Sequence, residues 1–591
     1  MGKLSDYRPL EKLVLPGLGE LDCSGLVLIV GPNSSGKSQL LRDVYAALSG
    51  EAREFTVATD IALRRPASAK WLVDALEEEG YVKQVTDANQ DVQLRPTTTY
   101  VGINSAIPQI SRRNADELYA AFSSAGSRRV PNAFAFHFIR MLVSPLFLDR
   151  RLNSLSDSNL IDFVNQPPQS DFHALHMNDR AKEYLESEIK ASFGTPIWLD
   201  ASNGARLTIL VSDGAESPEP RDRLSPSKMA TFRSIEREGD GLRSYVAICI
   251  AVLLGRRPVS LIDEPEMCLH PPQAYRLGQF IGRHTESDSN VTLVATHSSH
   301  VLRGILQSSD NMKIVRLTRK NKKFSASIVQ TSALREALAK PSVRAESVLD
   351  GVFAQGVVIV EADTDRVVYQ TALESIPGQG QIDLHFTSVG GKGGIASAAG
   401  FYRRLGIPFA ILADLDVIAD LGELKRILEA AGRTDSAASL LELASSVAER
   451  IKEMSPKVDE TAFGIRLNSI AAMPRVWSNG DDFAIRRELR ELSADLNQMR
   501  RLKRGGVREL PPDIATEVGQ LLDRLREVGV FLVPVGELEE WVLGRHIGIT
   551  RDKGAWANEA ALALKQGKAE AGEILDFVKL VATYLRERVF A

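Results

Sequence analysis

Residues 31–38 read Gly31-Pro-Asn-Ser-Ser-Gly-Lys-Ser38, which fits the pattern G-x-x-x-x-G-K-[ST] of phosphate-binding loops. The apolar run Leu26–Val30 precedes the loop, and a helical pattern over Gln39–Leu48 follows it. A strand, a loop and a helix in this order are the context that the motif requires. The backbone N–H groups of such a loop and the N-terminus of its helix face bound phosphates. The stretch therefore predicts an α/β unit built around a phosphate site.

The residue types of the loop indicate which contacts each side chain makes. Lys37 is expected to reach the β- and γ-phosphates of a nucleoside triphosphate, and Ser38 to hold Mg²⁺. The residues that we expect to bind ATP and its Mg²⁺ are Asn33, Ser34, Ser35, Gly36, Lys37, Ser38 and the more distant Asp263.

The composition is that of an ordinary globular protein, with 44% hydrophobic and 25% charged residues among 591. This length predicts about three or four domain-sized units. Because the net charge is only −4, contacts with nucleic acid must come from local basic patches. Cys23, Cys249 and Cys268 have no metal-ligand spacing, and we expect buried, reduced thiols. The sequence shows neither a signal-peptide pattern nor an apolar run of about 18 residues, so we expect a cytoplasmic protein without membrane contact.

A second motif supplies the acids that a phosphate-binding loop needs for hydrolysis. The run Pro258–Glu264 reads as a buried strand that ends in two adjacent carboxylates. Asp263 is expected to support Mg²⁺ through water, and Glu264 to polarise the attacking water. A further buried strand, Val291–Ala295, leads to His297, which is placed to sense the γ-phosphate at the end of its strand.

The words Asp263-Glu-Pro-Glu-Met-Cys-Leu-His-Pro271 and Thr296-His-Ser298 resemble the ATPase head shared by ABC transporters, SMC-type proteins and RecF-like proteins. In such heads a signature motif precedes the acidic strand and completes the ATP site of a partner subunit. Here that position holds Glu238–Ser244, which departs from the usual LSGGQ but keeps a glycine before a helix. The resemblance implies a homodimer or higher homo-oligomer that closes through its heads on ATP. The lack of apolar spans and of long heptad arms argues against a transporter and a rod-armed SMC protein.

A second group of acids lies in the C-terminal half. A buried strand that begins at Gly356 is expected to end at Glu361, and the stretch Ile407–Asp416 is expected to form a strand whose end carries Asp414 and Asp416. In a strand, residues two apart project to the same side, so both aspartates can face one metal. In a parallel sheet the strand ends gather at one edge, which brings Glu361 beside the pair. Carboxylate oxygens suit one or two Mg²⁺ or Mn²⁺ ions and phosphodiester chemistry.

A glutamate and then DxD in successive βα units resembles a TOPRIM domain, although Ala362 stands where that family has glycine. An ATPase head joined to a TOPRIM domain resembles the OLD (overcoming lysogenisation defect) nucleases. That resemblance implies a second-metal role for Asp365, a late acidic ligand at Glu537 or Glu539, and a catalytic lysine at Lys568. The implied site set is therefore Glu264, His297 and Lys568 for catalysis and Glu361, Asp365, Asp414, Asp416 and Glu539 for metal.

The expected fold is α/β in two parts. An ABC-type P-loop ATPase domain spans residues 1–330 and contains a segment at about 50–230 that reads as helical and is a candidate for dimerisation. A linker covers residues 331–355, and a Rossmann-like TOPRIM domain spans 356–591 with a helical insertion at about 421–527. That insertion carries the basic run Arg500–Arg504. Arginine pairs in the first part, such as Arg150-Arg151, are expected on solvated surfaces.

The favoured hypothesis is an ATP-regulated, divalent-metal-dependent DNA endonuclease. The resemblance adds an antiphage role, in some members together with a partner defence protein. The alternative is an ATP-switched clamp or scaffold that binds DNA or a partner, with a non-catalytic TOPRIM domain. A primase- or topoisomerase-like enzyme is disfavoured because neither a tyrosine nucleophile context nor zinc-ribbon cysteines occur.

Overall fold

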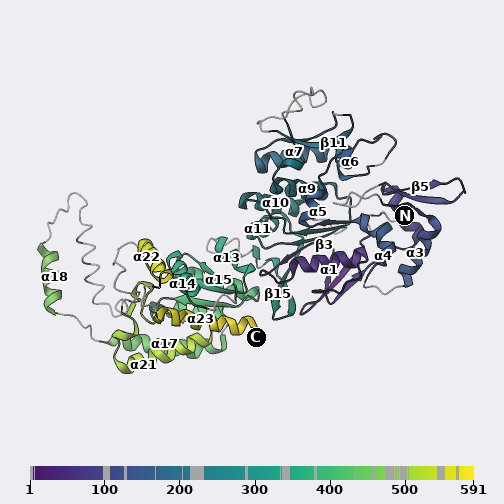
Figure 1. Cartoon of the computed structure of the whole chain (residues 1–591). Coiled ribbons are helices and arrows are strands. Elements are labelled where there is room, and N and C mark those ends of the chain that lie inside the picture. The colour runs from purple at the N-terminus through teal and green to yellow at the C-terminus, as the bar shows by residue number, and fades with distance from the viewer. Residues whose placement is uncertain are drawn as a thin grey trace. The chain divides into compact units, whose positions relative to one another are not determined.

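The computed structural model describes residues 4, 7–97, 107–124, 129–166, 168–202, 204–212, 232–285, 290–332, 334–335, 346–377, 382–432, 434–454, 460–472, 485, 489, 492, 502–503, 505–541, 553–567 and 572–590. The chain divides into two compact units, Met1–Thr331 and Ser332–Ala591 (Figure 1).

A six-stranded sheet forms the centre of the N-terminal unit, in the order β16-β15-β3-β14-β13-β8. Its strands are β3 (Gly25–Val30), β8 (Val143–Leu146), β13 (Val259–Asp263), β14 (Val291–Ala295), β15 (Met312–Lys320) and β16 (Lys323–Val329). All neighbours pair in parallel except the hairpin of β15 and β16. The strand that leads to His297 therefore lies between the strand of the phosphate-binding loop and the strand of Asp263.

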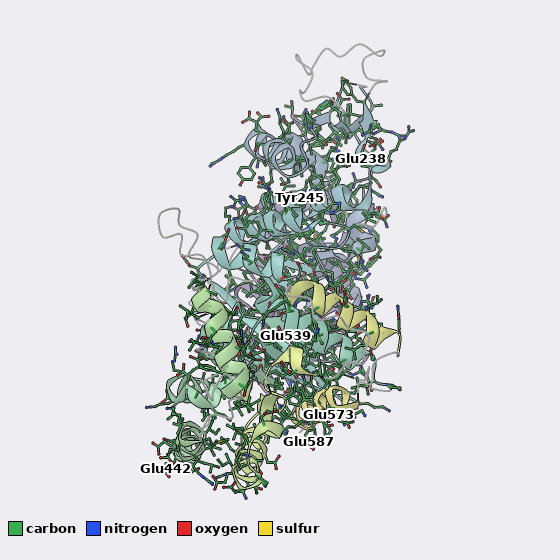
Figure 2. The ribbon with its side chains drawn as sticks, turned by 90° about the vertical axis from the view of Figure 1, so that its left-hand side faces the viewer. Glu238, Tyr245, Glu442, Glu539, Glu573 and Glu587 are labelled. Carbon is green, nitrogen blue, oxygen red and sulfur yellow. The ribbon has the colours of Figure 1, made fainter. Side chains whose placement is uncertain are left out.

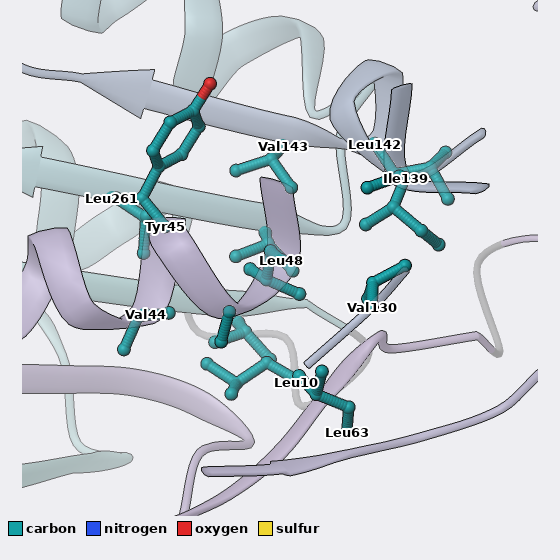
Figure 3. Packing of buried hydrophobic residues seen from close by; sticks show 14 of the residues in the cluster. Leu10, Val44, Tyr45, Leu48, Leu63, Val130, Ile139, Leu142, Val143 and Leu261 are labelled. Carbon is teal, nitrogen blue, oxygen red and sulfur yellow. The ribbon is translucent and has the colours of Figure 1, made fainter. Parts of the chain in front are cut away.

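Helices cover both faces of this sheet because its strands are apolar on both sides. Helix α1 (Lys37–Ser49) lies on one face, while α9 (Asp240–Leu254), α10 (Pro271–His284) and α11 (Ser299–Ser308) lie on the other (Figure 1). Successive side chains of β3 point to opposite faces of the sheet. Those of Val27 and Ile29 belong to the hydrophobic core between the sheet and α1. Figure 3 shows part of this core, which includes Val44 and Leu48 of α1 together with Leu10 and Leu261.

The stretch at about 50–230 contains more strand than the sequence pattern predicts. β8 is a strand of the central sheet, and the pattern missed it because Val143-Ser-Pro-Leu146 is short and contains a proline. Pro145 is tolerated there because β8 is the edge of the sheet. The smaller sheets are β2-β1-β4, β5-β6-β7 and β10-β11-β12 with β9 beside β11. Their strands are β1 (Leu10–Leu15), β2 (Gly19–Asp22), β4 (Asp60–Leu63), β5 (Val82–Thr86), β6 (Val92–Pro96), β7 (Ile110–Ser111), β9 (Ser158–Asn159), β10 (Ile197–Asp200), β11 (Arg206–Val211) and β12 (Arg233–Ser234).

The helices of this stretch pack around those sheets. They are α2 (Ala69–Glu78), α3 (Arg112–Ser124), α4 (Asn132–Phe134), α5 (Leu148–Asn153), α6 (Asp171–His176) and α7 (Asp179–Phe193). Two cysteines of the unit, Cys23 and Cys249, are buried as expected, but Cys268 is exposed. It lies in the turn after β13 with a φ of 64°, outside the helices and strands that form the core.

A buried carboxylate, Asp43 of α1, holds the segment that follows this helix. Its side chain is fully buried and accepts the backbone N–H groups of Thr56, Val57 and Ala58 at 2.9, 2.7 and 3.2 Å. Arg53 balances the charge with a 2.9 Å ion pair. This arrangement brings Val57 against Gly36, where an added Cβ would lie 2.9 Å from the Val57 methyl carbon. The carboxylate thus fixes one wall of the phosphate-binding loop.

The C-terminal unit contains a four-stranded parallel sheet in the order β18-β17-β19-β20. Its strands are β17 (Gly356–Val360), β18 (Leu384–Ser388), β19 (Phe409–Ala413) and β20 (Val530–Leu532). Helices α14 (Asp363–Glu374), α22 (Lys553–Lys565) and α23 (Gly572–Phe590) pack on one side of the sheet, and α15 (Lys392–Arg404) with α16 (Leu421–Ala430) packs on the other. Between β19 and β20 the chain also forms α17 (Thr434–Glu453), α18 (Glu460–Ala472) and α21 (Pro512–Glu527).

The expected α/β fold class is confirmed, with a P-loop unit followed by a second, Rossmann-like sheet. None of the described helices is both long and apolar enough to cross a bilayer.

Replacement of Asp43 by alanine is expected to lower the free energy of unfolding of the N-terminal unit by about 2–4 kcal/mol, because buried N–H donors and Arg53 lose their acceptor. Denaturant unfolding monitored by circular dichroism measures the change. The exposed Asp149, replaced by alanine, is the matched control and should shift the unfolding free energy by less than about 0.5 kcal/mol. Equal effects of the two changes would contradict the anchoring role.

Candidate functional site

The phosphate-binding loop uses two glycines where no side chain fits. Gly31 has a φ of 144°, and an added Cβ would lie 2.1 Å from the Leu317 carbonyl oxygen. Gly36 has a φ of 97° and caps α1, with Phe324 of β16 2.8 Å from the position of an added Cβ. Both positions therefore require glycine, as a loop that wraps phosphates does. Of the predicted ligands, Asn33 and Ser34 are exposed at the tip of the loop and Ser35 is buried.

Polar groups of this loop lack partners that a nucleotide would supply. The Lys37 ammonium is buried and donates to the carbonyl oxygens of Gly31 and Pro32, at 2.9 Å each. The Ser35 hydroxyl is buried without a hydrogen-bond partner, as is Oδ1 of Asp263. Burial raises the pKa of Asp263, which also bonds to Ser38. An ammonium, the N-terminus of α1 and a desolvated acid beside Ser38 fit a triphosphate with its Mg²⁺.

His297 and two glutamates form a group next to this loop. The Nδ1 atom of His297 lies 3.5 Å from Oε1 of Glu264 and 3.3 Å from Oε1 of Glu266. The hydrogen bond to Glu264 raises the pKa of His297, and the same bond lowers the pKa of Glu264. Glu266 is buried and accepts the Thr296 hydroxyl and the His297 backbone N–H, so it fixes the backbone that carries the histidine. The structure thus brings the predicted Glu264 and His297 together.

Arg151 fixes the backbone of the two adjacent acids, Asp263 and Glu264. Its guanidinium donates to the carbonyl oxygens of Asp263 at 2.7 Å and Glu264 at 3.3 Å. Glu264 has a φ of 47°, a strained conformation for a residue with a side chain, and Arg151 stabilises it. The residue is fully buried, so the expectation of a solvated arginine pair is wrong here. From the sequence alone, an arginine that is buried and binds backbone carbonyl oxygens cannot be distinguished from an arginine on the surface.

The segment at the expected signature position packs against the same group. Gly239 caps α9, and an added Cβ at Gly241 would lie 2.3 Å from the Cys268 carbonyl oxygen in the turn after the acidic strand. Arg243 donates to the Leu152 carbonyl oxygen of α5, next to Arg151. Deeper in α9, Tyr245, which is labelled in Figure 2, donates to Glu188 of α7 at 2.9 Å.

The second group of acids lies at the carboxyl edge of the C-terminal sheet. Glu361 follows β17 and Asp414 follows the adjacent β19, and the Asp414 N–H points to Glu361 Oε1 at 3.5 Å. From β17 the chain adds β18 on one side and then β19 on the other, so the direction of strand addition reverses at β17. Open α/β sheets bind ligands at such a reversal. β19 ends at Ala413, and Asp416 lies in a 3₁₀ helix, Leu415–Ala419, so the expected strand alternation does not carry the pair. Instead, this turn after β19 brings the two aspartates to one lysine.

Burial and mutual repulsion change the protonation of these acids. Burial, and then the Asp414 charge, raises the pKa of Glu361 to about 7. Burial raises the pKa of Asp365 to about 6, although its carboxylate caps α14 by accepting the Ala362 N–H at 3.0 Å. Burial and Glu539 raise the pKa of Glu537. Desolvated carboxylates of this kind are stabilised by a cation.

Lysines pair with these acids in the structure. Lys392 bonds to Asp416, and Lys553 lies 2.7 Å from Glu539, which is labelled in Figure 2. Lys503 lies 2.8 Å from Asp414, 3.6 Å from Asp416 and 3.7 Å from Glu537. Within the described residues, no three Asp, Glu, His or Cys side chains stand as a ready set of metal ligands. The acids have the hard oxygens that Mg²⁺ or Mn²⁺ takes, and lysines now neutralise them.

The predicted catalytic Lys568 lies outside the described residues. The sequence interpretation did not single out Lys503 as a site residue, although it noted the basic run at 500–504. A basic run in a long insertion does not predict that one of its lysines contacts acids at the edge of the sheet.

Comparisons with known proteins bear on both halves of the chain. Residues 352–416 match the family "Overcoming lysogenization defect protein-like, TOPRIM domain". Residues 113–303 match the family "AAA domain, putative AbiEii toxin, Type IV TA system". A relative named OLD nuclease, from Thermus scotoductus, is 26% identical over 517 residues, which cover 79% of this chain and 92% of that protein.

The chain is similar to OLD nucleases in that it joins a P-loop ATPase domain to an OLD-like TOPRIM domain. Among solved structures, an SMC head bound to the C-winged helix domain of ScpA is 14% identical and covers 56% of this chain and 99% of its own, with a TM-score of 0.32. The SMC head domain from Thermotoga maritima, also 14% identical, covers 55% of this chain and all of its own, with a TM-score of 0.25.

Replacement of Arg151 by methionine is expected to lower the kcat of ATP hydrolysis at least about tenfold, because the strained Glu264 backbone loses its clamp. The KM for ATP should change less than threefold, since Lys37 and the loop are intact. Steady-state phosphate release measures both constants. Arg150→Met is the matched control, because Arg150 stacks on Tyr45 with 4.4 Å between the guanidinium carbon and the ring centroid and does not touch the acids. Equal losses in the two variants would contradict the clamp.

Binding of Mn²⁺ at the carboxylates is expected to release protons below pH 7. Glu361, with a pKa of about 7, and Asp365, with a pKa of about 6, must lose their protons to bind a metal. The apparent affinity should therefore rise up to about tenfold per pH unit between pH 6 and 7 and level off above pH 7. Calorimetry in buffers of different ionisation enthalpy counts the released protons. A flat profile from pH 6 to 8 would show that neither acid takes part.

Proposed function

We propose that this protein is an ATP-binding and ATP-hydrolysing, divalent-metal-dependent DNA endonuclease that nicks or cleaves duplex DNA at the carboxylate site. The observation that carries the proposal is the pairing of Glu361 and Asp414 at adjacent strand ends, buried enough to raise the pKa of Glu361 to about 7. Buried acids that repel each other at a sheet edge are suited to holding a metal. The OLD-like TOPRIM match over 352–416 covers these acids.

In the ATPase unit each residue has a distinct task. Lys37 binds the phosphates after it leaves the loop carbonyl oxygens of Gly31 and Pro32. Asp263 and Ser38 would hold Mg²⁺, and Glu264 would orient the attacking water. His297 stays hydrogen-bonded to Glu264, so it positions this acid and faces the γ-phosphate.

In the TOPRIM unit Glu361, Asp414 and Asp416 would hold the first Mg²⁺ or Mn²⁺, and Asp365 with Glu539 or Glu537 would hold a second. A bound divalent ion supplies charge stabilisation at the scissile phosphate and an activated water. Lysines complete the site: Lys553 positions Glu539, and Lys568 is proposed to stabilise the leaving oxygen.

The same proposal includes a homodimer or higher homo-oligomer formed through the ATPase heads. The signature-position segment supports it, because Gly239 caps the N-terminus of α9 without a side-chain hydrogen bond, and a helix N-terminus of this kind is suited to binding a partner's nucleotide. The proposal also includes an antiphage role in the cytoplasm, with a partner defence protein, which rests on the resemblance to OLD nucleases.

One observation favours the second candidate, an ATP-switched clamp or scaffold. Lys503 and Lys392 already neutralise Asp414 and Asp416, so the acids are stable without any metal. In a scaffold this network would be structural, and removal of either partner would unfold the C-terminal unit without changing a reaction.

Supercoiled-plasmid cleavage with Mg²⁺ or Mn²⁺, with and without ATP, tests the function. Wild-type protein is expected to nick or linearise the plasmid. Asp414→Ala should reduce cleavage by at least about a hundredfold, because a metal ligand is lost. Lys37→Ala should remove ATP binding and leave the carboxylate site intact, so it isolates what ATP controls.

The matched control is Asp576→Ala, an exposed acid of α23 that pairs only with Lys579 among the described residues. Intact plasmid in the presence of ATP hydrolysis, for every metal tried, would favour the clamp. A folded Asp414→Ala variant that cleaves as the wild type does would exclude the carboxylate site as the nuclease.

A further inference from the structure

Lys503, in the basic run at 500–504, lies beside acids of the TOPRIM unit. Lys503 places its ammonium 2.8 Å from Asp414, 3.6 Å from Asp416 and 3.7 Å from Glu537. These acids come from two strand ends, after β19 and after β20, and they are proposed metal ligands. The ammonium therefore stands where the carboxylate oxygens converge.

The backbone of Lys503 is fixed by close contacts and does not depend on its side chain. Gly536 has a φ of 107°, and an added Cβ would lie 2.0 Å from the Lys503 carbonyl oxygen. The Gly536 carbonyl oxygen accepts the Leu415 N–H at 2.9 Å, inside the turn that carries both aspartates. Leu502, the neighbour of Lys503, is buried. The glycine therefore links the lysine backbone to the DxD turn.

The side chain, by contrast, has a path to solvent. Its exposed fraction is 29%, against 19% for Asp414 and 24% for Asp416. An ammonium on a flexible four-carbon chain is a point charge without a fixed coordination geometry. It can balance several carboxylates and leave them without a change in the backbone. These are the properties of an exchangeable cation.

We propose that Lys503 is an internal cation that occupies the place of a divalent metal among Asp414, Asp416 and Glu537, and that a metal must displace it to bind. This inference rests on the metal-dependent function proposed above and adds its regulation. In the metal-free protein the lysine holds the acids together and suppresses their repulsion. The lysine also weakens metal binding, so that the site fills only when the free metal concentration is high enough.

Lys392 does not fulfil the same role. Within the described residues it bonds to Asp416 alone of the three acids, from the first residue of α15. Lys553 neutralises Glu539, which follows β20. Of the lysines described in the structure, Lys503 is the one that bridges acids from both strand ends.

The test is Mn²⁺ binding to the full chain without nucleotide, followed by the electron paramagnetic resonance signal of free Mn²⁺. Lys503→Met is expected to bind Mn²⁺ at least about tenfold more tightly than the wild type, because a positive charge no longer competes for the carboxylates. Lys503→Arg keeps the charge and should stay within threefold of the wild type. Lys579→Met, on the exposed face of α23, is the matched control and should bind as the wild type does.

Unchanged or weaker Mn²⁺ binding by a folded Lys503→Met variant would overturn the inference; if that variant also fails to cleave DNA, Lys503 is instead a phosphate ligand. Thermal unfolding checks the fold, and Lys503→Gln is the second variant. If both variants are unfolded, Lys503 belongs to the structural framework and the inference is equally wrong. Asp414→Ala distinguishes failure of the proposed function from failure of this inference. If the Asp414→Ala variant binds Mn²⁺ like the wild type, Asp414 is not a metal ligand and the proposed function is wrong. If Mn²⁺ binding depends on Asp414 but is unchanged by substitution of Lys503, only this inference is wrong.

Discussion

Both candidate sites depend on one constraint: parallel strands gather acids at one sheet edge, and buried acids need a cation. In the N-terminal sheet, β13 delivers Asp263 and Glu264 beside the phosphate-binding loop. In the C-terminal sheet, β17 and β19 deliver Glu361 and Asp414 side by side. Because like charges in a desolvated cleft repel, the chain has to bring positive charge to each edge. Where that charge comes from decides how each site behaves.

The ATPase unit uses two cations with different tasks. Arg151 is fully buried and bonds to backbone carbonyl oxygens, so its charge and its geometry are permanent parts of the fold. Among the residues that the structure describes, Lys37 donates to two loop carbonyl oxygens that a nucleotide would replace. A guanidinium suits the first task because it makes several bonds at once in a fixed plane, and an ammonium suits the second because it moves easily.

The sequence predicted the parts of these sites that depend on local pattern. The loop at 31–38, the acids at 263 and 264 and the glutamate at 361 all follow apolar runs, and the structure places each one at a strand end. Contacts between distant segments leave no such pattern. Arg151 reads as half of a surface pair, and Lys503 as part of a charged insertion, yet both reach acids through packing. The pairing of Asp414 with Asp416 was expected from strand alternation, but a 3₁₀ turn produces it.

The same division explains why β8 and the smaller sheets were missed. β8 is short, contains Pro145 and lacks the alternation of a typical strand. It forms a strand because it pairs in parallel with β13. β8 matters for function because α5 follows it within two residues and carries Arg151 to the acidic pair. An edge strand that looks irregular in sequence thus positions the clamp on which the Glu264 backbone depends. Long-range pairing, rather than local propensity, sets the geometry at both carboxylate edges of this chain.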